Sequence, residues 1–212
     1  MAKPVLGIDF GMSNTSAAWI DDEARVRAIP MRDDGSFSMP TVVWYDGKGN
    51  VLVGQSAKEM ALADPQNTIY GFKRFIGRRY ASDFVHRLKD RLPYRIVAGP
   101  DGDVAFESHG RVRPISETTF HVINRVLELA QAQLTTLGSR DSFEECVLTV
   151  PAHASFRQRR ALRLSAEELV RYRVMAERAR QDETDRKGNG DPGNGGQGSG
   201  RAAVRHEETP VI

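Results

Sequence analysis

Cysteine is almost absent from this chain of 212 residues, which holds only Cys146. One cysteine cannot close an internal disulfide, and chains without disulfides are typical of reducing compartments. Charge of one sign is not in excess either, because 30 basic and 28 acidic side chains leave a formal net charge of +2. So small a surplus argues against a dedicated nucleic-acid binder, which needs a concentrated basic face.

Long hydrophobic runs are also missing. No apolar stretch approaches the length that a bilayer requires, and the apolar run after Lys3 is too short for a secretory signal. Hydrophobic residues still make up 40% of the chain, which excludes a fully disordered protein. We therefore expect a soluble, cytoplasmic, globular protein with no nucleic-acid and no membrane partner.

Several common signatures of chemistry do not occur. The chain has no Walker A sequence and no GxSxG elbow, and the strand and turn at residues 7–15 are not a GxGxxG dinucleotide fingerprint. Its histidines show no metal-ligand spacing, which argues against a zinc site; they are His86, His109, His121, His153 and His206. Cys146 lies in an apolar run and is interpreted as core filler rather than as a nucleophile.

The pattern of apolar and turn-forming residues predicts an α/β chain. Strands are expected near residues 5–8, 15–20, 25–29, 41–45, 51–53, 93–97, 103–107, 111–113 and 146–150. Helices are expected at 57–63 with Ser56 as the cap, at 83–90, at 116–137 with Gly138 after its end, and from about Ser155. The first three strands predict an antiparallel meander, and the unbroken apolar run at 146–150 predicts a buried strand.

Composition changes near Glu167. Residues 167–187 are dominated by Arg, Glu and Asp and predict a charged helix. Residues 188–212 include a glycine-rich low-complexity stretch and predict a disordered tail.

The segment from Gly7 to Thr15 is the most informative for function, because a strand there runs into a glycine turn followed by small polar residues. Gly11 allows the backbone to fold close to a ligand, so that the N–H groups of Met12, Ser13 and Asn14 point at phosphate oxygens. Asp9, at the strand end, is placed to hold a water of hydrated Mg²⁺. Taken alone, this segment favours a plain hairpin turn in which Asp9 and Asn14 satisfy backbone donors.

Four further segments extend this pattern in a fixed order: residues 40–43, 53–58, 67–78 and 148–160. Together with residues 7–15 they resemble the heat-shock protein 70 chaperone family, in the N-terminal part of its nucleotide-binding domain. The resemblance covers roughly residues 4–166. Five motifs in order are far more specific than one loop.

The resemblance implies an incomplete actin/hexokinase-like, ribonuclease H-like ATPase lobe over residues 1–166, with a smaller subdomain inserted at about 37–114. It implies ATP or ADP with Mg²⁺ as ligands, and unfolded client proteins and co-chaperones as partners. By the same resemblance, Gly11, Met12, Ser13 and Asn14 contact phosphates and Asp9 serves the metal. Lys73 is then the catalytic lysine, whereas its residue type alone is typical of a solvated surface position.

Two more positions, Pro151 and Arg159, match residues that the family uses to relay nucleotide state to its substrate-binding domain. Without the resemblance, Pro151 is a strand stop and Arg159 belongs to an arginine-rich helix face that is solvated or weakly anion-binding.

The sequence departs from the family at two places. Met12 replaces the usual threonine, and after Ala166 the family pattern stops, without a second phosphate loop. We therefore expect an N-terminal fragment with little or no ATP turnover and marginal folding. A non-catalytic adaptor built on one lobe and a small-molecule kinase of the same superfamily are the alternatives.

Overall fold

The structure, a computed structural model, describes residues 4–139, 142–143, 145–150 and 154–167. All of them belong to the first of two units, residues 1–173, so the tail predicted at 188–212 and all but the first residue of the helix predicted at 167–187 lie outside them. The strands are β1 Val5–Phe10, β2 Asn14–Ile20, β3 Val26–Ala28, β4 Ser38–Pro40, β5 Val42–Tyr45, β6 Val51–Val53, β7 Thr68–Tyr70, β8 Arg95–Ala98, β9 Val104–Ser108, β10 Arg111–Pro114 and β11 Glu145–Leu148.

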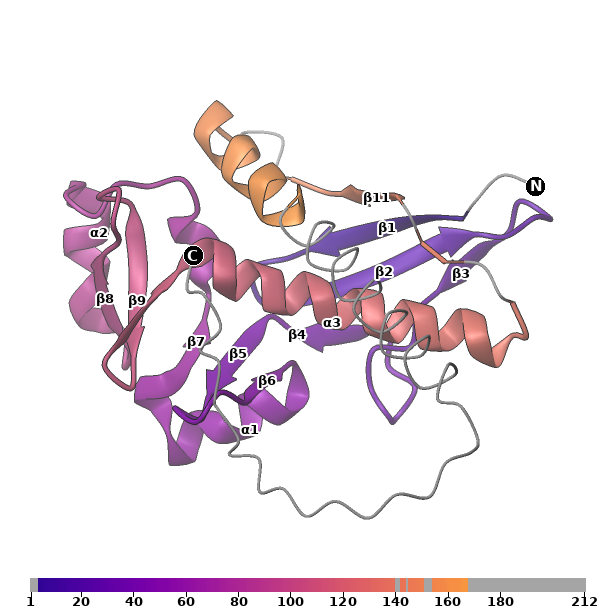
Figure 1. Cartoon of the computed structure of the whole chain (residues 1–212), viewed down its shortest axis with the longest axis horizontal. Coiled ribbons are helices and arrows are strands. Elements are labelled where there is room, and N and C mark those ends of the chain that lie inside the picture. The colour runs from indigo at the N-terminus through magenta and orange to yellow at the C-terminus, as the bar shows by residue number, and fades with distance from the viewer. Residues whose placement is uncertain (1–3, 140–141, 144, 151–153, 168–212) are drawn as a thin grey trace, which may run out of the picture. The chain divides into compact units, whose positions relative to one another are not determined.

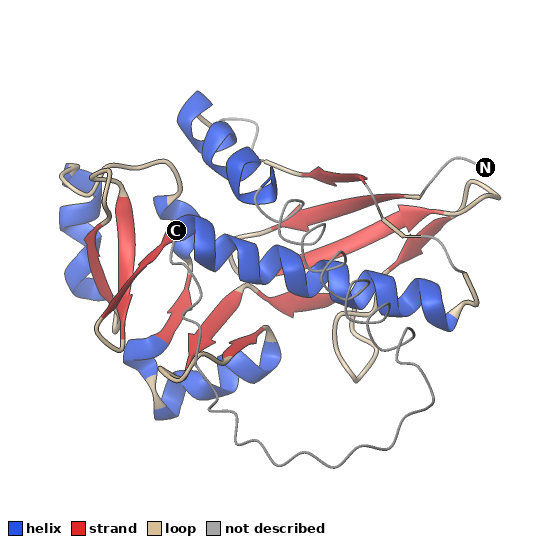
Figure 2. Cartoon of the chain, viewed as in Figure 1, coloured by secondary structure: helices blue, strands red, loops and turns tan. Residues whose placement is uncertain are grey.

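Three α-helices have complete bounds: α1 Gln55–Ala63, α2 Asp83–Leu88 and α3 Ile115–Thr136. A fourth helix covers residues 156–167. Short 3-10 helices lie at Pro65–Asn67, Phe72–Phe75 and Lys89–Arg91. The mixed α/β composition predicted from the sequence is confirmed (Figure 2).

The largest sheet is built on β1 and β2. Its order is β11-β1-β2-β3, and β4 pairs with the first part of β2. Strands β1, β2 and β3 are antiparallel neighbours, which confirms the predicted meander, whereas β11 runs parallel to β1. The turn-rich segment before residue 40 gave no strand signal, so β4 was not predicted.

The edge strand β11 differs from its prediction as a buried strand. Val147 is 61% exposed, while Cys146 and Leu148 are half-buried and pack on the core. The register pairs Leu6 with Cys146 and Gly7 with Val147, so only alternate residues share the buried side of Leu6. An unbroken apolar run indicates burial only when both faces of a strand are covered, which β11 lacks among the described residues.

Helix α3 packs along the sheet, and Figure 1 shows it running beside β1 and β2. Its buried residues follow the three- and four-residue spacing of one helix face; they include Val122, Ile123, Val126, Leu127, Ala130 and Leu134. Gly138 follows the helix with a φ of 77°, and the N–H groups of Gly138 and Ser139 donate to the carbonyls of Thr135 and Leu134. This Schellman arrangement confirms the predicted cap.

Residues between β4 and α3 form two further three-stranded sheets, β6-β5-β7 and β10-β9-β8. The hairpin of β5 and β6 was predicted, as was the end of α1 at Ala63. The predicted Ser56 cap is wrong: α1 already begins at Gln55, with Gly54 before it at a φ of 82°. A backbone in that conformation favours glycine, so chain geometry rather than a side-chain cap sets this start.

A cluster of aromatic side chains joins the sheets. Phe106 of β9 lies with its ring centroid 6.4 Å from those of Phe72 and Phe75 and 5.5 Å from that of Tyr94. Phe72 in turn lies 6.1 Å from Phe10, the last residue of β1. All five side chains are almost completely buried. The 3-10 helix Phe72–Phe75 is therefore held between Phe106 of β9 on one side and Phe10, at the end of β1, on the other.

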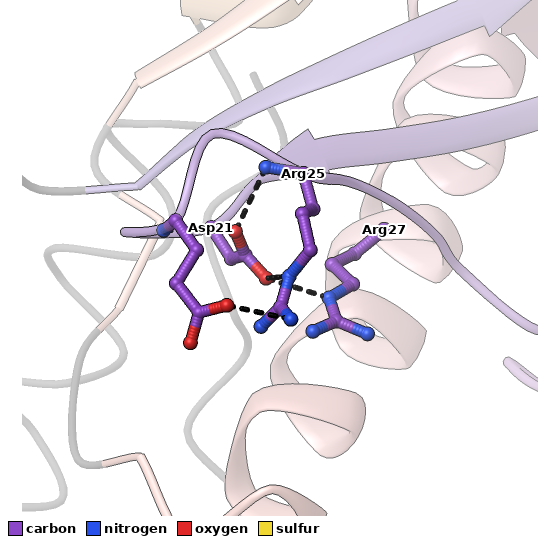
Figure 3. A network of polar contacts seen from close by, with 4 residues as sticks. Asp21, Arg25 and Arg27 are labelled. Carbon is purple, nitrogen blue, oxygen red and sulfur yellow. Dashed lines mark hydrogen bonds and ion pairs between the residues drawn. The ribbon is translucent and has the colours of Figure 1, made fainter.

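The turn between β2 and β3 is organised by Asp21 (Figure 3). Its carboxylate accepts hydrogen bonds from the Arg25 N–H at 2.9 Å, from Arg27 Nε at 2.7 Å and from Arg25 Nε at 3.0 Å. The Arg25 N–H, followed by the two side chains, holds the pKa of Asp21 well below its usual range, against the opposing effect of burial. The ionised carboxylate thus stabilises the folded turn.

We expect Asp21→Asn to lower the melting temperature by a few degrees at neutral pH. A carboxyl group whose pKa is lowered by folding stabilises the fold above its unfolded pKa, about 4, and loses this effect as the pH falls. The difference between the wild type and the variant should therefore shrink below about pH 4. Thermal melts at several pH values test this, with Asp22→Asn in the same turn as the control; a pH-independent difference would contradict it.

Candidate functional site

The site is built at the end of β1, where the chain turns sharply at Gly11. The Gly11 N–H donates to the Asp9 carbonyl at 3.1 Å, which closes the turn. A Cβ atom at Gly11 would lie only 2.1 Å from the Asn14 carbonyl oxygen, closer than any real contact. The loop over residues 11–14 (the 11–14 loop) therefore requires glycine at its first position because of its own backbone, whereas the sequence had suggested glycine there for close approach to a ligand.

Thr41, between β4 and β5, fastens this loop from the side. Its N–H donates to the Ser13 carbonyl at 2.8 Å and its hydroxyl donates to the Gly11 carbonyl at 3.1 Å. The Thr15 and Thr41 hydroxyl oxygens lie 2.8 Å apart, and both side chains are buried. Sequence reasoning missed Thr41, because a threonine at the start of a strand carries no local sign of a partner 30 residues away.

The outer surface of the 11–14 loop carries unused hydrogen-bond donors. Neither the Met12 N–H nor the Ser13 N–H donates to any other described residue, and Met12, Ser13 and Asn14 are exposed. Consecutive free backbone N–H groups form a concave anion site. The missing threonine hydroxyl at Met12 leaves these backbone donors intact, while the Met12 sulfur accepts a contact of 3.6 Å from Arg74.

Asp9 stands beside the loop with its side chain exposed. The Thr149 hydroxyl donates to Asp9 Oδ1 at 2.8 Å, and the Thr149 N–H extends the β11 pairing by donating to the Ile8 carbonyl at 3.0 Å. No described residue donates a hydrogen bond to the second carboxylate oxygen, Asp9 Oδ2. Thr149 thus orients the carboxylate and leaves one oxygen for a ligand, a second positioning contact that the sequence did not indicate.

Lys73 comes to the same place from a distant part of the chain. It lies on the 3-10 helix that begins after Gly71, a residue in the left-handed conformation. Its amino group donates to the Phe10 carbonyl and lies 5.1 Å from the centre of the Phe10 ring. Partial burial lowers the pKa of Lys73, and the nearby Asp9 carboxylate opposes that shift. The interpretation of Lys73 as an ordinary solvated lysine is therefore wrong.

The structure thus gathers Asp9, the 11–14 loop and Lys73 at one point. Arg159 lies instead on the helix over 156–167, exposed, with its Nε donating to the Ala154 carbonyl at 3.0 Å. This helix starts after Ser155, as predicted, and the structure adds a reciprocal cap between Ser155 and Gln158 that was not predicted. Pro151 lies outside the described residues.

The donor set suits a magnesium ion that is held mainly by its other ligands. Among the described residues no group of three or more His, Cys, Asp or Glu side chains gathers to hold a metal. Mg²⁺ usually keeps several waters and takes one or two carboxylates plus phosphate oxygens, so Asp9 beside free N–H donors fits it.

None of the helices in the described part of the chain is long and apolar enough to cross a membrane.

Comparison with known families agrees with this geometry. The sequence model of the Hsp70 protein family matches residues 5–175, well over half of the chain. The match includes the 11–14 loop, Lys73 and Arg159. Proteins of this family act as chaperones and bind ATP or ADP with Mg²⁺. The chain therefore belongs to the Hsp70 family, and its function is of the chaperone type in general.

Proposed function

We propose that this chain binds Mg-ATP and Mg-ADP at the 11–14 loop. The observation that carries the proposal is the position of Lys73, which reaches the end of β1 across 63 residues of sequence. A cation, two N–H donors that no described residue uses and a carboxylate with one unused oxygen are thus brought together at the end of β1. A plain hairpin turn has no need of a partly buried lysine at its base, so the arrangement favours a phosphate site over a structural turn.

Each group has a role in this proposal. The N–H groups of Met12 and Ser13 would receive phosphate oxygens, and Asn14 would complete the loop. Asp9 would hold Mg²⁺ through a water, and the ion supplies charge neutralisation for the phosphates when bound. Lys73, as a compact charge on a flexible stem, would follow the terminal phosphate.

The proposal extends to the domain organisation. Residues 1–166 would form part of an actin/hexokinase-like lobe, with the subdomain inserted at about 37–114 and with residues 167–187 and 188–212 as a charged helix and a tail. Two separate three-stranded sheets between β4 and α3 support such an insertion. Pro151 and Arg159 would couple nucleotide state to an ATP-driven cycle on unfolded clients and co-chaperones.

Isothermal titration of the full chain with Mg-ATP and Mg-ADP tests the proposal. We expect micromolar binding, about −8 kcal/mol. Asp9→Asn and Lys73→Ala should each weaken it by about tenfold or more, because each removes a charge that faces the phosphates or the metal. Asp22→Asn and Lys48→Ala are the matched controls, since both residues are exposed and lie away from the loop.

A folded sample that gives no heat with either nucleotide would overturn the proposal. The adaptor alternative would then take its place, and a search for a protein partner without nucleotide would follow.

A further inference from the structure

A pocket adjoins the candidate site and shares Met12 and Lys73 with it; it lies between the 3-10 helix Phe72–Phe75, α2 and the helix over 156–167. Its volume is about 270 Å³. The helix over 156–167 packs directly on Gly77, because a Cβ atom at Gly77 would lie 2.9 Å from the Arg157 and Gln158 backbone. The pocket is therefore part of the packed structure rather than a gap between loose segments.

Much of the pocket surface is apolar. Ile76 and Leu162 are buried and form the floor together with Ala154, while Phe84 of α2 and the half-exposed Met12 stand at the sides. Ligand pockets are typically lined by such side chains, with a few polar groups that set orientation. This pocket is slightly smaller than the range of roughly 300–1,000 Å³ for drug-sized ligands, so its occupant is small.

The polar side chains that line the pocket are Gln158, whose Oε1 accepts from the Ser155 N–H, and three cations: Lys73, Arg74 and Arg78. Arg74 Nε donates to the Gly71 carbonyl at 2.9 Å, and Arg78 Nε donates to the Arg74 carbonyl at 3.0 Å. The Arg78 guanidinium also lies 3.9 Å from the centre of the Phe84 ring. Each guanidinium is therefore held by its inner nitrogen. Arg74 Nη2 also contacts the Met12 sulfur at 3.6 Å, so Arg74 Nη1 and the two outer nitrogens of Arg78 are the donors that no other described residue engages.

These two arginines have no carboxylate partner among the described residues. Other arginines of the chain do: Arg79 pairs with Asp103 at 3.4 Å, and Arg113 with Glu117 at 2.6 Å. No described carboxylate neutralises these two guanidinium groups, which lie beside apolar side chains. A ligand with an anionic group and an apolar part matches this arrangement.

We infer that this pocket binds a small organic carboxylate with an apolar body. The carboxylate lies on Arg74 and Arg78, whose planar forks fit it in a bidentate manner. The apolar body lies against Phe84, Ile76 and Leu162. Met12 and Lys73 border both this pocket and the proposed nucleotide site, so the carboxylate is assigned to Arg74 and Arg78 alone and is tested without nucleotide.

Phenylbutyrate and phenylbutylamine are suitable probes, because they differ in the sign of the charge and share the apolar body. Binding to the full chain, without nucleotide, is followed by amide chemical shifts. We expect phenylbutyrate to bind with a Kd of about a millimolar or below, as its size allows. Phenylbutylamine should bind about tenfold more weakly, and acetate, which lacks the body, should shift few signals.

Two variants locate the site. Arg78→Met and Arg74→Gln should each weaken phenylbutyrate binding by about fivefold or more, while Arg87→Met, an exposed arginine of α2 outside the pocket, should leave it unchanged. Equal binding of acid and amine by the wild type would overturn the inference, even if a variant failed to fold. Unchanged binding in both folded variants, or shifts confined to other parts of the chain, would overturn it as well.

Discussion

Gly11→Ala is expected to weaken Mg-ATP binding by about a hundredfold, the largest effect of any single change at the candidate site. A methyl group there would lie 2.1 Å from the Asn14 carbonyl oxygen, so the 11–14 loop has to open. Opening moves the Met12 and Ser13 N–H groups away from the position where they meet phosphates. Charge-assisted hydrogen bonds of this kind contribute roughly 1.5–3 kcal/mol each. If the open loop weakens both by about half, the loss is ~2.7 kcal/mol, which corresponds to about a hundredfold in affinity.

Gly7→Ala is the matched control, because it makes the same change four residues earlier on β1. There the added methyl would lie 3.4 Å from the Ala18 carbonyl oxygen, an ordinary contact. Titration of both variants with Mg-ATP, next to their melting curves, separates binding from stability. Equal affinities for Gly11→Ala and Gly7→Ala in folded protein would show that the loop does not hold the nucleotide.

Phe106→Ala is expected to reduce the free energy of unfolding by about 3–5 kcal/mol, a large part of the stability of a domain of this size. Phe106 is completely buried, and its ring contacts Phe72, Phe75 and Tyr94. The substitution leaves a cavity at the point where the sheets meet. Urea unfolding measures the change, with Phe37→Ala, 57% exposed, as a control that should shift it by less than about 1 kcal/mol.

The Phe106→Ala substitution should also weaken Mg-ATP binding at the candidate site. Phe72 and Phe75 flank Lys73 on one short helix, and Phe72 packs on Phe10. A loosened cluster allows Lys73 to leave the end of β1, so Mg-ATP affinity should fall in Phe106→Ala even where the protein is still folded. An unchanged affinity in folded variant protein would mean that the aromatic cluster stabilises the fold without positioning Lys73.

Local patterns predicted most of the elements but failed where a strand or cap depends on its surroundings. The amphipathic stripe of α3 and its glycine cap needed only neighbouring residues and were predicted within one residue of the observed helix. At β11 the apolar run indicated burial, yet one face of the strand has no cover among the described residues and leaves Val147 exposed. At α1 the hydroxyl of Ser56 suggested a cap, whereas the backbone of Gly54 sets the start.

The sequence by itself determined the strand, turn and strand around Gly11, the long helix and the family to which the chain belongs, because each follows from residues in a short or ordered stretch. Only the tertiary structure decided that Thr41 and Thr149 position the 11–14 loop and Asp9, and that Lys73 reaches Phe10. The physical reason is the core: burial of Phe10, Phe72 and Phe106 in one cluster brings together segments that share no local pattern.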